Sequence, residues 1–458
     1  MTMNSNFLQN HQQLSVISNL KNSEELPFSA VLSKEEIEKH MKKIKHRDRV
    51  FPPHTTLWAF LSQVMDDDSS QQAAVARVIA TVVAEGKEPP SANTSAYSQA
   101  RSRLPEKRLS NLTQETATQI EEETPKEWMW RGRKIKLIDG STLSMPDTPK
   151  NQEAYPQSDR QKSGVGFPMM RIVVIIAYVT GVLLDLAMGP YSGKKTGEHA
   201  LLRQLMSSFK EGEVILGDSY YPSFFLMAQL MKLRVDAVFP MHGARKHDFR
   251  RGERLGKKEH IVAWKKPSKP EWMEIEEYES FPSEILVREV SVTNERSGFR
   301  SISRVLVTTF LDPKEVSKSD LSELYDCRWF VEITLRSIKE TMHMDILRGK
   351  TPEMVRKEIW VHILAYNLVR KIMAQAAFLK GKKANALSFK AALQFIKAFW
   401  TKGIFDEDNL ELYLKLLELI SYKSVGNRPG RAEPRRVKRR PKAFPRLQKS
   451  REFYKNAA

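Results

Sequence analysis

Apolar residues recur along the chain with two different spacings, and these divide it into helical and strand-forming regions. Residues 1–125 are largely polar with helical periodicity, which predicts a helical N-terminal domain. Ser33 and Glu36 have the spacing of a capping box ahead of its first helix. Three further helices are predicted, at residues 57–64, 73–83 and 97–104.

From residue 134 the pattern changes to short β-branched runs separated by brief connections. These runs predict strands at residues 134–145, 169–180, 181–189, 214–218 and 235–241, with helices at 197–209 and 223–233. Three strands followed by two helix–strand units are typical of an α/β fold that has a mixed sheet with helices on its faces.

A charged segment at about 241–300 separates these strands from the next one, at residues 304–310. Its alternating stretch EILVREVSV predicts a β-rich insertion. A long helix is then predicted over residues 320–342, with Asp320 as its cap and Glu323 three residues on. We therefore take residues 126–345 as a second domain that contains the insertion.

The last part of the chain returns to helical periodicity and then becomes strongly basic. Helices are predicted at residues 358–379, 386–399 and 410–419, so residues 346–422 form a helical C-terminal region. Residues 423–458 are interrupted by proline and carry 13 Lys or Arg against two Glu. Such a tail should be extended and should bind phosphate groups.

The charge of the whole chain favours a polyanionic partner. Lys and Arg number 74 against 55 Asp and Glu, a net charge of +19, which favours a nucleic-acid binder over a basic protein with solvated charges. The sequence has no apolar run of the ~18 residues that span a bilayer and no secretory signal at its start, so we expect no membrane function and a cytoplasmic location. Cys327 is the single cysteine, which excludes an internal disulfide and a zinc-finger cluster.

Two aspartates are predicted to end strands where a turn begins, Asp139 in LIDGST and Asp218 in VILGDSYY. Strand ends of a mixed sheet can lie side by side, and two close carboxylates repel unless a proton or a cation sits between them. Hard divalent cations such as Mg²⁺ prefer these oxygen ligands. Taken singly, however, an aspartate at a strand end is usually a turn or cap residue.

A third acid lies in the predicted long helix, on a charged stripe beside the packing face. Tyr325, Arg328, Glu332 and Lys339 are separated by three, four and seven positions, which places them within roughly 60° of arc on a helix. Such a stripe would suit DNA phosphates arriving at a metal held by Glu332. The alternative is an ordinary ion pair between Arg328 and Glu332 on a solvated helix.

Two other groups of residues carry weaker signals. The helix at 97–104 presents Arg101 and Arg103 after a turn rich in Pro, Ser and Asn, as a helix that contacts DNA bases would, or as the solvated face of a small bundle. His242, His247 and His260 lie in the basic insertion, where a solvated or DNA-facing role is favoured over metal binding.

The spacing Y-x2-R-x3-E-x6-K of the helical stripe resembles the YREK signature of the DDE transposases typified by insertion sequence four. The pairs Asp139–Gly140 and Gly217–Asp218, and the run YNLVR from Tyr366 to Arg370, are also similar to that family. The resemblance extends from about Phe51 to the tail, nearly the whole chain.

This resemblance implies a ribonuclease-H-like core with an insertion before the glutamate-bearing helix, and cut-and-paste movement of a mobile element. It implies that Asp139, Asp218 and Glu332 are catalytic and hold Mg²⁺, with Mn²⁺ as a substitute. Tyr325, Arg328 and Lys339 would grip phosphates near the DNA end. The partners would be terminal inverted repeats and target DNA, bound by a homodimer on paired ends in the nucleoid.

The chain departs from the family at one position and leaves two alternatives open. Some relatives have a base-stacking Trp in the strand before the glutamate helix, where SRVLVTT places Arg304, so a hairpin intermediate is not assured. The alternatives to a transposase are a nuclease with the same core that only hydrolyses and a DNA-binding protein that has lost catalysis. The presence of all three acids and their three signature partners argues against the latter.

Deleting residues 423–458 should weaken binding to every DNA sequence, because the tail would neutralise phosphates whatever the bases. The slope of log K against log salt should become shallower by about 0.9 for each phosphate that the tail neutralises, as measured by fluorescence anisotropy at several salt concentrations. An unchanged slope would show that the tail lies away from the DNA.

Overall fold

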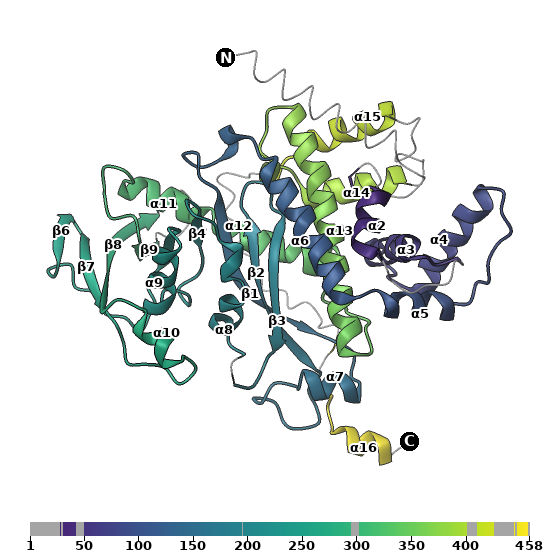
Figure 1. Cartoon of the computed structure of the whole chain (residues 1–458), viewed down its shortest axis with the longest axis horizontal. Coiled ribbons are helices and arrows are strands. Elements are labelled where there is room, and N and C mark those ends of the chain that lie inside the picture. The colour runs from purple at the N-terminus through teal and green to yellow at the C-terminus, as the bar shows by residue number, and fades with distance from the viewer. Residues whose placement is uncertain are drawn as a thin grey trace.

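In the part of the chain that the structure describes, a nine-stranded sheet crosses the molecule with helices on both faces (Figure 1). This computed structural model describes residues 28, 31–42, 50–194, 196–294, 302–400, 410–425, 444 and 447–456. The strands are β1 (Ile135–Ser144), β2 (Met169–Ala177), β3 (Leu183–Pro190), β4 (Val214–Leu216), β5 (Asp236–Pro240), β6 (Glu253–Gly256), β7 (Glu259–Lys265), β8 (Glu284–Asn294) and β9 (Ile302–Thr308). Their spatial order is β3-β2-β1-β4-β5-β9-β8-β7-β6. The sheet is mixed, because β1 pairs antiparallel with β2 and parallel with β4.

The two faces of β1 pack against different helices. Leu137 belongs to the apolar cluster that includes α12 (Trp329–Arg336) and α13 (Pro352–Leu379). Ile138 belongs to a second cluster with α8 (Glu198–Arg203) and α9 (Phe224–Lys232). Since side chains alternate along a strand, every position of β1 is assigned to one of these two faces. The helix expected over residues 197–209 is shorter than predicted and continues as a 3₁₀ turn at Met206–Ser208.

The first N-terminal helices are packed beside the sheet, on the right of Figure 1. They are α2 (Lys34–Met41), α3 (Pro53–Met65), α4 (Gln71–Ala84) and α5 (Ser95–Arg103), and α6 (Glu106–Glu122) follows them at the centre of the view. The capping box of Ser33 and Glu36 is confirmed. The sequence did not predict α6, whose many Thr, Glu and Gln residues give a weak helical pattern, although it lies along α13.

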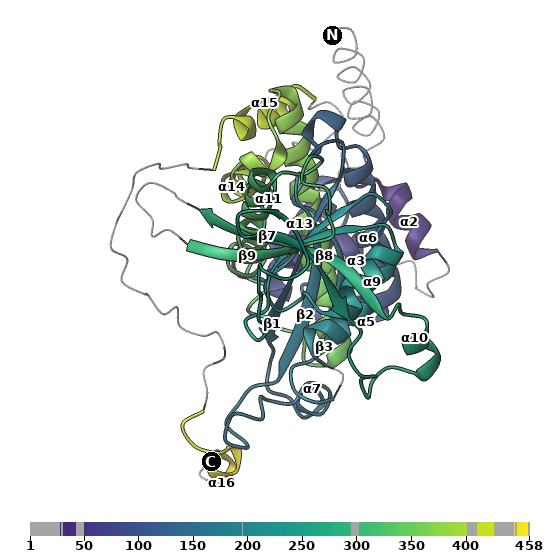
Figure 2. The ribbon, with the colours of Figure 1, turned by 90° about the vertical axis from the view of Figure 1, so that its left-hand side faces the viewer.

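The strands of the charged segment continue the main sheet instead of interrupting it. β6, β7 and β8, with α10 (Ile275–Glu279), form the left side of Figure 1 and face the viewer in Figure 2. The buried guanidinium of Arg288 on β8 bonds to Glu259 and to the carbonyl oxygen of Val316, at 2.7 Å. Arg288 therefore ties the insertion to the loop that leads into α11 (Lys318–Asp326).

Helix α13 packs on one face of the sheet, and side chains of its run YNLVR bind the turn between β2 and β3. The Tyr366 hydroxyl donates to the Gly181 carbonyl at 2.8 Å. The Asn367 side chain bonds both the N–H and the carbonyl of Leu183, each at 2.9 Å. These bonds satisfy backbone groups at the edge of the sheet, where β3 has no further strand beside it among the described residues.

The C-terminal region contains α14 (Phe389–Trp400), α15 (Leu410–Ser421) and α16 (Arg451–Asn456). The helical α16 contradicts the extended conformation predicted for the tail, while residues 426–443 of that prediction lie outside the described residues. α16 lies beside the loop between β1 and β2 (Figure 2), where Arg451 bonds to Asp147 and the N–H of Leu447 bonds to the Val165 carbonyl at 3.0 Å.

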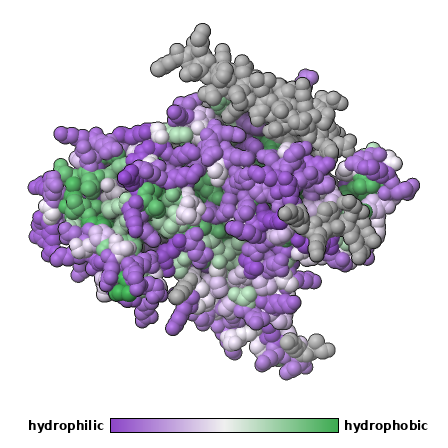
Figure 3. Space-filling model, in the orientation of Figure 1, coloured by the Kyte–Doolittle hydropathy of each residue, from purple (hydrophilic) through white to green (hydrophobic). Residues whose placement is uncertain are grey.

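The face of the molecule seen in Figure 3 is mostly hydrophilic, with apolar side chains gathered over the insertion strands on the left. Leu286 of β8 is 49% exposed. Among the described helices, none combines the length and the apolar character that a bilayer span requires.

Arg288→Met should lower the free energy of unfolding by about 3–5 kcal/mol, because it leaves the Glu259 carboxylate buried without its partner. Urea denaturation would measure the loss. The double variant Arg288→Met/Glu259→Gln should recover part of it, since no uncompensated charge is left. A single variant as stable as the parent protein would contradict the role of this ion pair.

Candidate active site

The two predicted aspartates lie where the parallel pairing of β1 with β4 ends. Leu137 and Leu216 are the last paired residues of this ladder. Asp139 and Asp218 each follow by two positions, so equal spacing brings them to the same level just beyond this ladder. Asp218 follows the end of β4, whereas Asp139 lies in the middle of β1, which continues beside β2 to Ser144, so the prediction that Asp139 ends a strand is wrong. Each carboxylate also bonds a nearby backbone N–H: Asp139 that of Gly140 at 2.8 Å, and Asp218 that of Tyr220 at 2.8 Å.

The environment of Asp139 disfavours its negative charge. Burial raises the pKa of Asp139 to about 6, and the charges of Asp218 and Glu198 act in the same direction. The Gly140 N–H and the charge of Arg328 act against this rise and lower the pKa. A nearby cation would stabilise the charged form of this carboxyl group, because it would offset the effects of burial and of the two other acids.

The predicted long helix is in fact three segments, so the prediction of one continuous helix is wrong. α11 ends before a turn at Cys327 and Arg328, whose N–H groups bond to carbonyls three residues back. α12 follows and passes into a π-helical turn at Ser337–Thr341, which contains Lys339. The cap of α11 is Ser317, and Asp320 completes the capping box from the third position.

Glu332 is bound to Arg328, its neighbour one turn earlier, and not to the aspartates. Arg328 Nη2 donates to Glu332 Oε1 at 2.6 Å. Arg328 also carries the positive charge that acts on Asp139, so it is close enough to influence both the glutamate and this aspartate. Within the ranges that the structure describes, no three acidic, histidine or cysteine side chains are grouped closely enough to hold one ion.

The donor set still fits a divalent cation by its chemistry. Asp139 and Asp218 offer only carboxylate oxygens, and their charges oppose each other. Glu332 is the third oxygen donor of this region, and one of its two carboxylate oxygens is paired with Arg328. The structure thus contains the ion pair between Arg328 and Glu332 that the sequence offered as the alternative for the third acid.

Lys339 lies against β1, where it contacts the strand two residues after Asp139. Its ammonium group donates to Ser141 Oγ at 3.1 Å and to the Thr142 carbonyl at 3.0 Å. Burial lowers the pKa of Lys339. The lysine is thus held on the face of β1 that carries Asp139, as the alternation of the strand requires.

Arg304 and Tyr325 are neighbours on the same side of the site. The Arg304 guanidinium lies over the Tyr325 ring, 5.2 Å from its centre. Tyr325 is only 5% exposed. Its ring is therefore covered by Arg304, whereas Arg304 itself is partly accessible.

Two further residues of this region were not identified from the sequence. Glu198, at the start of α8, contributes charge at Asp139, and its own pKa is raised by burial and by the charge of Asp218. Trp329, at the start of α12, is 55% exposed and lies less than one turn before Glu332. An aromatic residue inside a charged stripe is a signal that could have been noticed, whereas nothing in the stretch GEHALLR distinguishes Glu198.

The N-terminal arginines and the insertion histidines are placed differently from the predictions. Arg101 is 6% exposed and donates to Gln63 Oε1 at 3.0 Å, so its guanidinium does not face DNA as predicted. Arg103 is exposed, and its contact with bases stays a prediction. His260 is 1% exposed and bonded to Glu289 at 3.0 Å, which contradicts a solvated or DNA-facing role.

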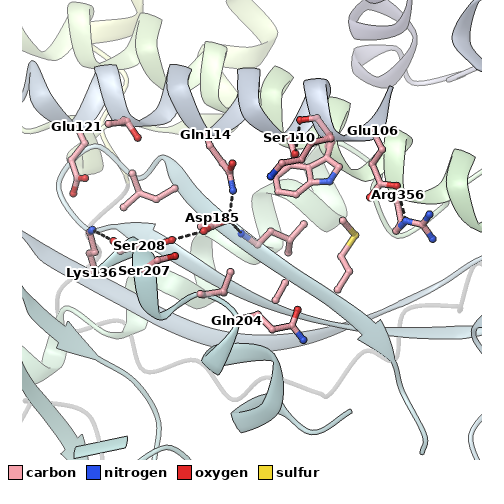
Figure 4. Close-up of a pocket in the computed structure, with 18 of the residues that line it drawn as sticks. Glu106, Ser110, Gln114, Glu121, Lys136, Asp185, Gln204, Ser207, Ser208 and Arg356 are labelled. Atoms are coloured by element: carbon pink, nitrogen blue, oxygen red, sulfur yellow. Dashed lines mark hydrogen bonds and ion pairs between the residues drawn. The ribbon is translucent and has the colours of Figure 1, made fainter. Parts of the chain in front are cut away.

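A cavity of about 870 Å³ between α6 and β3 lies apart from these residues (Figure 4). Asp185 accepts hydrogen bonds there from Gln114, at 2.6 Å, and from Ser208. The Lys136 ammonium is paired with Glu213 at 2.8 Å. These polar groups satisfy one another, and none of the predicted catalytic residues lines the cavity.

Residues 130–368 match the protein family described as "Transposase DDE domain", and this range contains all three predicted acids. The match covers more than half of the 458 residues, so the chain belongs to the DDE transposase family. The resemblance carried by the YREK spacing is thereby confirmed. Proteins of this family act on DNA and use divalent metal ions, and the chain is an insertion-sequence transposase.

Individual relatives agree with this assignment. The transposase InsG for insertion sequence element IS4 of Escherichia coli K12 is 28% identical over 407 residues, which are 87% of this chain and 88% of the relative. The putative transposase InsL for element IS186A of Escherichia coli K12 and the transposase for element IS421 of Escherichia coli match a shorter stretch. Each is 33% identical over 69 residues, 15% of this chain and 19% of the relative.

In metal-free protein, Asp139→Asn should raise the free energy of unfolding above pH 6. The pKa of Asp139 is about 6 in the folded protein against an ordinary 3.8, so the folded state binds the extra proton between these values. The parent protein therefore loses stability as pH rises through this window, by on the order of 2 kcal/mol, and the variant does not.

Urea denaturation in EDTA at pH 4 and pH 8 would test this expectation. The stabilisation should be present at pH 8 and nearly absent at pH 4. A difference between the two proteins that is the same at both pH values would contradict the proposed environment of Asp139.

Proposed function

We propose that this transposase moves its insertion sequence by cut-and-paste transposition. It would hydrolyse the phosphodiester at each terminal inverted repeat and then join the freed 3′-OH to target DNA. The observation that supports this most strongly is the placement of Asp139 and Asp218 side by side within a DDE transposase domain. The strand order β3-β2-β1-β4-β5 also supports a ribonuclease-H-like core.

The metal centre would be formed by Asp139, Asp218 and Glu332, with Mg²⁺ as the ion and Mn²⁺ as a substitute. When bound, the metal would stabilise negative charge on the attacking and leaving oxygens of the phosphodiester. The contribution of the chain is to hold the two aspartates where the pairing of β1 with β4 ends and to supply Glu332 from α12.

Arg328 would change partners when DNA binds. It is paired with Glu332 in the protein alone. A phosphate offers the same bidentate oxygen geometry to a guanidinium. Transfer of Arg328 to a phosphate would free the Glu332 carboxylate for the metal, so DNA binding and assembly of the metal centre would be coupled.

The other contacts with DNA would come from residues around the site. Lys339 beside β1 would grip a phosphate near the DNA end, and Arg304, which covers Tyr325, would do so from β9. The exposed ring of Trp329 offers a surface on which an unpaired base can stack. Tyr325 would support Arg304 and not reach the DNA directly.

For the roles of the domains we keep the division predicted from the sequence. Residues 1–125 would bind the DNA ends through exposed side chains such as Arg103, and residues 126–345 would be the catalytic core. Residues 346–422 would complete this core or form dimer contacts, and residues 423–458 would hold phosphates. A homodimer on paired ends, acting in the nucleoid of the cytoplasm, would bring the two termini together.

Glu332→Gln should abolish cleavage while preserving binding to the terminal repeats. The change keeps the size of the side chain but removes one anionic metal ligand. Cleavage of a labelled terminal-repeat duplex in Mg²⁺ should fall by about 10²-fold or more. The matched control, Glu323→Gln on the exposed side of α11, should cut at the parent rate.

The same assay separates the transposase from a nuclease that only hydrolyses. A pre-cleaved end with a free 3′-OH should be joined to target plasmid by the parent protein and not by Glu332→Gln. Hydrolysis without any joining would favour the nuclease. Equal cleavage by Glu332→Gln and the parent would remove Glu332 from the metal centre.

A further inference from the structure

Glu198 reaches the catalytic region from the face of the sheet opposite to Glu332. It opens α8, which packs with α9 on the face that carries Ile138. Asp139 has the same parity as Leu137, and so it points to the other face, where α12 lies. Figure 1 shows α8 in front of the sheet and α12 behind it.

The Glu198 carboxylate is accommodated by the missing side chain of Gly140. A Cβ atom built on Gly140 would lie within 2.6 Å of both carboxylate oxygens of Glu198. The backbone conformation of Gly140 does not require glycine, so the requirement is one of space. Gly140 thus leaves a gap beside Asp139 that this carboxylate occupies.

Tyr221 joins Glu198 to the second aspartate. Its hydroxyl donates to Glu198 Oε2 at 3.3 Å, and its ring is fully buried. The ring packs closely against Gly217, where a Cβ atom would lie 2.9 Å from it, and Gly217 precedes Asp218. Glu198 therefore lies directly against Gly140 of β1, and Tyr221 links it to the end of β4.

An acid at the start of a helix ordinarily extends into water. If Glu198 only stabilised the start of α8, its side chain would be expected to do the same. Here the side chain turns inward to a partly buried position against Gly140, within reach of the charge of Asp218. Close carboxylates are electrostatically unfavourable unless cations compensate them, and in the chain itself Arg328 acts on Asp139 and Arg171 on Glu198. Such an arrangement is more common at functional sites than in a framework.

We propose that Glu198 supports the metal-binding centre from the opposite face of the sheet, where it adds negative charge near Asp139 and Asp218 and positions Tyr221 against the end of β4. This inference rests on the proposed metal-binding role of the aspartates. It assigns Gly140 the task of admitting Glu198, and it makes Glu198 a positioning residue that acts on the ion through the two aspartates.

The test is the affinity of the DNA-free protein for Mn²⁺, measured by isothermal titration calorimetry. Glu198→Gln retains an oxygen acceptor for Tyr221 but loses the charge, and it should weaken Mn²⁺ binding by about 10-fold. Asp139→Asn should weaken it more. Glu211→Gln, an exposed acid that pairs with Arg234, is the control and should leave the affinity unchanged.

The outcomes distinguish the role of Glu198 from the metal centre as a whole. If Asp139→Asn binds Mn²⁺ as the parent does, the proposed metal centre itself is wrong. If Asp139→Asn weakens binding while Glu198→Gln matches Glu211→Gln, only the role of Glu198 is overturned. Thermal melting without metal shows whether each variant is folded.

Gly140→Ala tests the same placement should Glu198→Gln fail to fold. It preserves every charge but fills the gap, so it should displace the Glu198 carboxylate and weaken Mn²⁺ binding several-fold. A folded Gly140→Ala protein with the affinity of the parent would contradict the proposed placement of Glu198.

Discussion

The parallel pairing of β1 with β4 ends at Leu137 and Leu216, and the arrangement of the proposed metal centre depends on that end point. Beyond it the two strands no longer share hydrogen bonds, and both aspartates follow at the same distance. The position of this point is fixed because β1 is also paired along its length with β2. The fold therefore creates two adjacent carboxylates before any metal or DNA is bound.

Other elements bring charged groups to this point from both faces. On one face the π-helical turn after α12 places Lys339 on β1, and Arg328 holds Glu332 nearby. On the other face α8 supplies Glu198 through the gap at Gly140. The buried Arg288 links the insertion to the loop before α11.

Much of the fold was predictable because the strands carry strong local patterns. β2 is a continuous β-branched run, and the capping box of Ser33 is a local interaction. The break between α11 and α12 was not predictable, because neither Cys327 nor Arg328 is a residue that breaks helices. Their turn is defined by hydrogen bonds to carbonyls three residues back.

The site was only partly predictable for a related reason. Asp139, Asp218 and Glu332 follow a recognisable spacing, but charge alone did not tell an exposed arginine from the buried Arg101. Arg101 is buried because Gln63 of another helix accepts its hydrogen bond. Glu198 was missed because its meaning lies in contacts with Gly140 and Tyr221, which only the folded chain brings together.

The most direct test of the metal centre is the anomalous scattering of Mn²⁺ in crystals of the protein bound to a terminal-repeat duplex. We expect an anomalous peak between the carboxylates of Asp139 and Asp218, with Glu332 turned toward the metal and Arg328 on a phosphate. A peak elsewhere, or Glu332 still paired with Arg328 while the metal is bound, would contradict this metal centre.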